Sequence, residues 1–148
     1  MARNLLDERK DMKKYIVLIA TALALFFWTD VFAQTSSENY DVFVPIAKYI
    51  RNGDAERLSA WFAENLEVTV FSNTNDASRN QARQIVKSFF DTYKPRSFEI
   101  NHTAGRPNMK YAYGTLTAGG ESMSVTIFVS CSEGKSYHIQ QLKFEKSN

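Results

Sequence analysis

His102 and His138 are the histidines of this chain, and imidazole both gives and takes a proton near neutral pH. An acid–base enzyme of the isomerase or hydrolase type would use His102, Asp91 or Tyr113. The sequence has no Gly-x-Ser-x-Gly elbow, no Cys-His pair at a recognisable spacing and no three or four metal-ligand residues at a recognisable spacing. These residue types favour a non-catalytic domain without metal or cofactor, and the acid–base enzyme is the alternative.

Aromatic residues suit binding better than catalysis. Tyr111 and Tyr113 are two residues apart, so they project from the same side of a strand. There they either line a pocket or an aromatic contact surface, or they pack across strands. We expect five residues to contact a small apolar or amphipathic ligand: Tyr49, Trp61, His102, Tyr111 and Tyr113.

Strict strand alternation predicts where the histidines point. His102 follows Ile100 by two residues, and His138 precedes Leu142 by four. Since side chains alternate between the two faces of a strand, each histidine is expected on the same face as its apolar neighbour. Both histidines are therefore expected to be able to reach the interior, whereas Trp61 and Phe62 are expected to fill the core beside a helix.

The N-terminal residues resemble an export signal. Lys13 and Lys14 precede an apolar run, residues 15–28, that is shorter than the roughly 20 residues of a membrane-spanning helix. Small residues at Val31 and Ala33 predict cleavage after Ala33. We therefore expect a signal peptide at 1–33, in which Met12 is an alternative translation start, then a polar leader at 34–39 and a single domain at 40–146. The protein is then periplasmic or extracellular; the alternative is an uncleaved membrane anchor.

Charge and cysteine content exclude two classes of protein. The chain has 18 basic and 16 acidic residues. Five of the basic and four of the acidic residues precede Gln34, so 13 basic and 12 acidic residues remain, with a net charge of +1. Such a balance provides no basic surface for a phosphate backbone, so no nucleic-acid partner is expected. Cys131 is the single cysteine, which excludes an intrachain disulfide and predicts a buried structural thiol.

Apolar periodicity predicts three helices. The first spans residues 42–52 and stops at Gly53, and Asp54 caps a second that ends near 64–65. The third begins after Ser78 or Asn80 and stops before Pro95, because the residue before proline is pushed out of the α region. The polar run 73–79 is expected to be a loop.

Five strands are predicted, one before the third helix and four after it. They span 66–71, 97–104, 109–118, 122–131 and 136–145, and short turns make the last four an antiparallel meander. The order ααβαββββ predicts an α+β fold in which three helices pack on a curved, mainly antiparallel sheet.

This order resembles the nuclear-transport-factor-two-like superfamily, which includes the ketosteroid isomerases and cystatin-like folds. The segments 52–56 (NGDAE) and 61–66 (WFAENL) carry the broad resemblance. The segments 94–98 (KPRSF), 113–116 (YGTL) and 137–142 (YHIQQL) are similar to a bacterial family of small exported domains of unknown function. The resemblance implies a cone with a possible cavity at its open end, and it implies no activity, because the fold hosts many functions.

The isomerase branch provides a test at two positions. Alignment places its oxyanion-holding tyrosine at Ile46 and its general-base aspartate at Val70. Neither aliphatic side chain can bind an oxyanion or remove a proton, so isomerase chemistry is disfavoured. We therefore expect an exported, non-catalytic binding or interaction domain that either holds a ligand in its cone or forms a homodimer through its sheet. A membrane contact is expected only through an uncleaved signal segment.

Overall fold

The computed structural model describes residues 9–15, 42–132 and 135–148, and the chain divides into two units, Met1–Ser37 and Glu38–Asn148. In the first unit, residues 9–15 form an exposed helical segment. Most of the expected signal peptide, its cleavage site and the polar leader lie outside the described residues. Within the described part of the chain, no helix is both long and apolar enough to cross a membrane.

Three helices of the second unit are each bounded at one end by a signal that the sequence carries. Helix α2 (Phe43–Asn52) stops at Gly53, which adopts a left-handed φ of 63°. Helix α3 (Ala55–Ser59) is capped by Asp54, whose carboxylate accepts a hydrogen bond from the backbone N–H of Arg57 at 2.9 Å. Helix α4 (Arg79–Thr92) begins with a capping box formed by Ser78 and Gln81.

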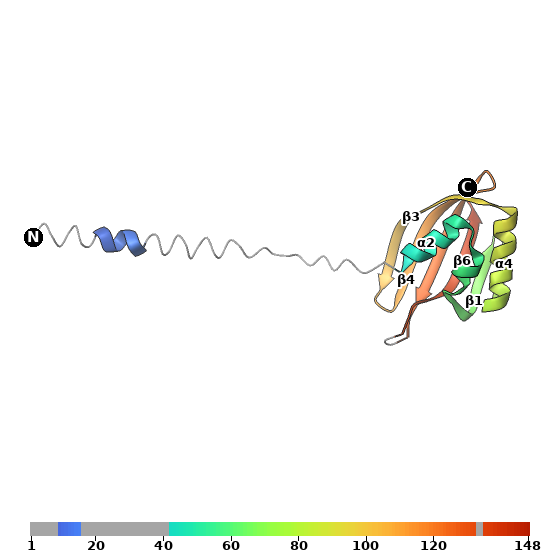
Figure 1. The fold of residues 1–148 in the computed structure, drawn as a ribbon, viewed down its shortest axis with the longest axis horizontal. Coiled ribbons are helices and arrows are strands. Elements are labelled where there is room, and N and C mark those ends of the chain that lie inside the picture. Colours follow the sequence, from blue (N-terminus) through green and yellow to red (C-terminus); the bar gives the residue numbers. More distant parts are fainter. Residues whose placement is uncertain (1–8, 16–41, 133–134) are drawn as a thin grey trace, which may run out of the picture. The chain divides into compact units, whose positions relative to one another are not determined.

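Six strands form one curved sheet in the order β2-β1-β6-β5-β4-β3. All neighbouring pairs are antiparallel except β1 and β6, which are parallel, so the first and last strands of the domain lie side by side within the sheet (Figure 1). The predicted α+β class and mainly antiparallel sheet are confirmed. The strand bounds are β1 (Phe62–Val70), β2 (Asn73–Ser78), β3 (Pro95–Arg106), β4 (Met109–Ala118), β5 (Glu121–Ser130) and β6 (His138–Lys146).

Two elements differ from the sequence prediction. The expected loop at 73–79 contains strand β2, which pairs antiparallel with β1 although only Ala77 of its side chains is buried. The second helix is five residues long, because the chain turns at Trp61 and enters β1 at Phe62. Phe62 pairs with Ile139 of β6 and is fully buried, so tertiary pairing overrides the helical spacing of Leu58, Trp61 and Phe62.

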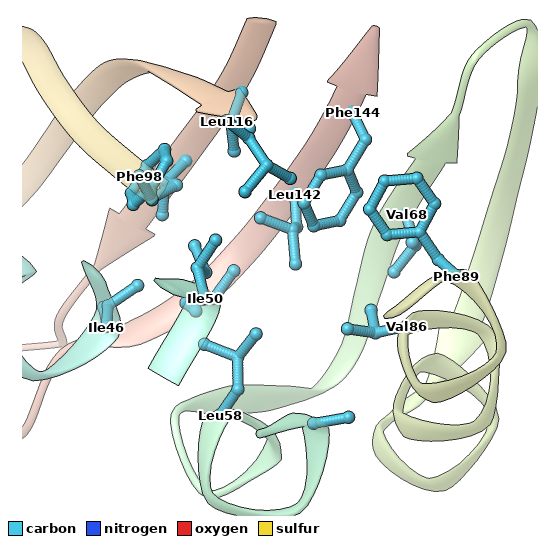
Figure 2. Close-up of a cluster of buried hydrophobic side chains, with 14 of the residues drawn as sticks. Ile46, Ile50, Leu58, Val68, Val86, Phe89, Phe98, Leu116, Leu142 and Phe144 are labelled. Atoms are coloured by element: carbon cyan, nitrogen blue, oxygen red, sulfur yellow. The ribbon is translucent and has the colours of Figure 1, made fainter. Parts of the chain in front are cut away.

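The helices cover one face of the sheet, which we call the inner face, and the space between them is filled by apolar side chains (Figure 2). Phe89 of α4 packs on Phe144 of β6 with 4.4 Å between the ring centroids. Ile46 and Ile50 of α2 are both fully buried within the same core. The space between the helices and the inner face therefore holds a packed apolar core.

Candidate functional site

We call the face of the sheet that is turned away from the helices the outer sheet face. On strands β4 and β5, this face presents aromatic and hydroxyl side chains. Alternation along β4 buries Ala112 and Leu116 on the inner face and turns Tyr111 and Tyr113 outward. Tyr113 is 44% exposed, which is high for a large aromatic side chain in the middle of a strand. The prediction that both tyrosines project from one side is confirmed, and that side is the outer sheet face.

Four rings form a row across β3, β4 and β5, which we call the aromatic row. Tyr111 stacks on Phe128 with centroids 4.5 Å apart, and it lies 6.5 Å from Tyr113 with the two ring planes within 9°. His102 continues the row at 6.2 Å from Tyr113. The structure thus brings together three of the five expected binding residues. Phe128 was missed, although its register opposite Tyr111 makes it a cross-strand partner.

His102 lies on the outer sheet face, and the expectation that it shares a face with Ile100 is wrong. Ile100 pairs with Gly114 and His102 pairs with Tyr113, so β3 contains one extra residue, Asn101, at this point. Such a β-bulge reverses the alternation that follows it. The Asn101 side chain donates a hydrogen bond to the Thr115 hydroxyl at 2.7 Å, which fixes it on the outer side.

A second bulge changes the direction of His138. Phe128 pairs with Gln141 and Val129 pairs with Ile139, so Gln140 is the extra residue in β6. Ile139 is fully buried, and His138 next to it pairs with Ser130 on the outer side. Neither histidine therefore faces the core.

Charged side chains flank the aromatic row and are absent from its centre. The outward residues of β4 and β5 are uncharged: Met109, Tyr111, Tyr113, Thr115, Thr117, Ser122, Ser124, Thr126, Phe128 and Ser130. On the β6 and β1 side, Glu67 accepts a hydrogen bond from the Gln141 amide at 2.6 Å and lies 3.8 Å from the Lys143 ammonium. On the β3 side, Glu99 and Arg106 occupy the corresponding outward positions.

Tyr49 and Trp61 lie elsewhere. Tyr49 lines a surface hollow between α2 and β3, and Trp61 is partly buried against the core at the turn before β1. The expectation that Trp61 and Phe62 fill the core holds fully for Phe62 and partly for Trp61. Three of the five expected binding residues thus belong to the aromatic row, and the other two lie in two separate places.

The three residues of the alternative acid–base site do not converge. Asp91 belongs to α4 on the inner side of the sheet and lies 2.9 Å from the Lys87 ammonium, whereas His102 and Tyr113 belong to the outer sheet face. At the two positions compared with the isomerases, Ile46 is fully buried and Val70 packs against the core. In the part of the chain that the structure describes, no three His, Cys, Asp or Glu side chains cluster as metal ligands would.

The end of the sheet near Pro107 holds a buried cation that sequence reasoning missed. Lys110 is 3% exposed, and its ammonium lies 5.5 Å from the centroid of the Tyr137 ring. The Tyr137 hydroxyl in turn donates a hydrogen bond to the Pro107 carbonyl. Cys131, expected to be buried, is partly exposed beside the same carbonyl.

Comparison with known proteins identifies a family and a fold. Residues 43–145 match the model of a domain of unknown function, DUF4783. A DUF4783 protein from Bacteroides uniformis is similar at 20% identity and a TM-score of 0.66, over 70% of this chain and 94% of the other. No curated protein shows a significant match to the sequence.

More distant structures share the fold. A cystatin-like domain of unknown function from Nostoc punctiforme has 11% identity and a TM-score of 0.58, covering 73% of this chain and 74% of the other. An NTF-2-like protein of unknown function from Silicibacter pomeroyi has 15% identity and a TM-score of 0.57, covering 76% and 99%. The resemblance read from the sequence is therefore confirmed for the family of unknown function, and these structures show that the fold is of the NTF2-like and cystatin-like kind.

Proposed function

Since the chain belongs to the DUF4783 family, whose domain has no known function, we propose from its geometry that it is a small non-catalytic interaction domain. Its outer sheet face pairs with the same face of a second copy. The observation that carries this proposal is the aromatic row on an uncharged pair of strands, with Tyr113 at its centre 44% exposed.

The outer sheet face has the composition of a protein–protein interface. Interface centres are depleted in charged residues and enriched in tyrosine and phenylalanine, and their rims are polar. Here the centre is formed by Tyr111, Tyr113 and Phe128, and Glu67 and Lys143 belong to the rim. This pattern supports burial of the aromatic row against another surface.

A second copy fits this surface better than a charged partner. In a two-fold symmetric pair, each residue near the axis meets its own equivalent or a close neighbour, so a charge there would meet a like charge. The uncharged outward residues of β4 and β5 avoid that repulsion. Two sheets also pack face to face about 10 Å apart, a separation that tyrosine side chains can bridge.

A non-catalytic role is supported by the separation of the titratable residues. His102 and Tyr113 lie on the face proposed for pairing, and Asp91 lies on α4 beside Lys87. General acid–base catalysis needs such groups within hydrogen-bond reach of one substrate. We further propose, from the signal-like residues 1–33 alone, that the domain acts outside the cytoplasm after cleavage following Ala33.

The oligomeric state tests the pairing. Sedimentation equilibrium of the purified protein should show a dimer, and Tyr113→Arg should weaken the dimer at least about tenfold by placing two cations near the symmetry axis. Ser88→Arg adds the same charge to an exposed position of α4 and should leave the dimer intact. A monomeric unmodified protein, or equal dimerisation of both variants, would contradict the proposal.

A further inference from the structure

A hollow of about 610 Å³ lies between helix α2 and strand β3, and we call it the α2–β3 groove. This volume is within the roughly 300–1,000 Å³ range of small-molecule sites. The groove is on the helical side of the sheet, so it is separate from the outer sheet face. Its lining consists of Phe43, Val44, Pro45, Ala47, Lys48, Tyr49, Arg51, Ile100 and Thr103.

Apolar groups line much of the groove. Phe43 and Ala47 are buried at 2% and 8% exposure, and Ile100 of β3 is partly buried against the core. Val44 is 68% exposed and is one of few large apolar side chains that the described residues leave open to solvent. A hydrocarbon chain lying against Val44 and Ile100 would remove this surface from water, which is favourable in proportion to the area covered.

Two cations stand on the same side of α2 as Val44. Lys48 follows Val44 by four residues and Arg51 follows Lys48 by three, which places the three side chains on one face of the helix. Neither cation forms an ion pair with any residue that the structure describes. Arg51 is held in place by a hydrogen bond from its Nη2 to the Phe98 carbonyl at 3.2 Å, which uses one of its five N–H groups.

We infer that the α2–β3 groove binds a fatty acid. Lys48 and Arg51 hold the carboxylate, and the hydrocarbon chain lies along Val44, Pro45 and Ile100. Cations beside an apolar hollow match the two parts of such a molecule, an anionic head and an apolar tail. This inference goes beyond the proposed pairing and does not depend on it.

A single amphiphile fits the groove better than a membrane surface does. A helix that lies on a membrane presents a broad apolar face to the lipid. The broad apolar face of α2, formed by Phe43, Ile46 and Ile50, is instead packed into the core. Val44 is the large hydrophobic residue that α2 exposes to solvent. The concave site therefore favours one bound molecule over insertion into a bilayer.

Titration calorimetry of the purified protein with laurate tests the inference. Laurate should bind, dodecanol should bind more weakly because its head is neutral, and acetate should not bind measurably because it lacks the chain. Lys48 forms no ion pair with the described residues, so its ammonium is available to a ligand. Lys48→Gln should therefore weaken laurate binding about fivefold. Lys87→Gln on α4 removes the same charge away from the groove and should leave the affinity unchanged.

Three results would overturn the inference. The first is the absence of laurate binding to the unmodified protein, and the second is an equal loss of affinity in both lysine variants. The third is binding to phosphatidylglycerol vesicles with no binding of monomeric laurate, which would assign this side of α2 to a membrane. Because dimerisation is measured separately, the failure of either proposal is distinguishable from the failure of the other.

Discussion

The ring of Phe98 occupies the space that a side chain at position 114 would fill. A Cβ atom built on Gly114 would lie 2.6 Å from the Phe98 ring carbon Cε2 and 2.6 Å from the Glu99 carbonyl oxygen. Phe98 is 1% exposed, so its ring has little room to move away. Because Gly114 of β4 has no side chain, β3 and the Phe98 ring can pack closely against the inner face at this point.

Gly114→Ala should lower the free energy of unfolding by roughly 1–3 kcal/mol, because the added methyl group overpacks the core. Urea denaturation measures the change. Adding Phe98→Leu to this variant should recover part of the loss, since the smaller side chain relieves one of the two close contacts. A Gly114→Ala protein as stable as the unmodified one would show that the ring does not lie over Gly114.

Phe89→Ala should lower the free energy of unfolding by roughly 3–5 kcal/mol, because Phe89 is 4% exposed and its ring contacts that of Phe144. Lys87→Ala removes an exposed ion pair with Asp91 and should cost less than about 0.5 kcal/mol. Comparing the urea midpoints of the two variants checks the orientation of α4. Similar midpoints would mean that α4 presents a different face to the sheet.

The bulge at Asn101 predicts opposite behaviour for two residues that strict alternation places together. Ile100→Ala should cost about 1–3 kcal/mol, less than a fully buried isoleucine, because Ile100 is half-buried against the core. In the monomer, His102→Ala should change stability by less than about 0.5 kcal/mol, because His102 is exposed on the unpaired outer sheet face. Thermal unfolding of both variants at concentrations low enough to keep the domain monomeric decides this, and a large cost for His102→Ala would place the imidazole inside.

The exported form should begin at Gln34, since Val31 and Ala33 provide the small residues of a cleavage site after the apolar run. The intact mass of the protein purified from its host gives the answer directly. A mass that includes residues 15–28 would instead indicate a membrane-anchored domain.

Element types were predictable where local signals and burial agree. Gly53, Asp54 and Ser78 act on the backbone near them, and they set the helix ends that the structure shows. Strand β2 was not predictable, because its sequence, NTNDAS, has little apolar content. It forms by backbone pairing with the free edge of β1, and that edge exists only in the folded domain.

Three of the four residues of the aromatic row were predictable as binding candidates, but their position in the fold was not. Tyr111 and Tyr113 are separated by two residues, so their shared face follows from alternation alone. The face of His102 depends on the extra residue Asn101, and a bulge leaves no clear mark in a polar stretch of one sequence. Pairing of Phe128 with Tyr111 likewise requires the register of β4 and β5.

The parallel pairing of β1 with β6 determines when the domain can fold during synthesis. Strand β6 lies between β1 and β5, so a chain that stops before His138 has two separate pieces of sheet, β1 with β2 and β3 to β5. Each piece would expose apolar residues that β6 covers, and contacts between residues far apart in sequence form slowly. The core therefore cannot close until β6 has been synthesised and released from the ribosome, and until then these residues remain accessible to chaperones and proteases.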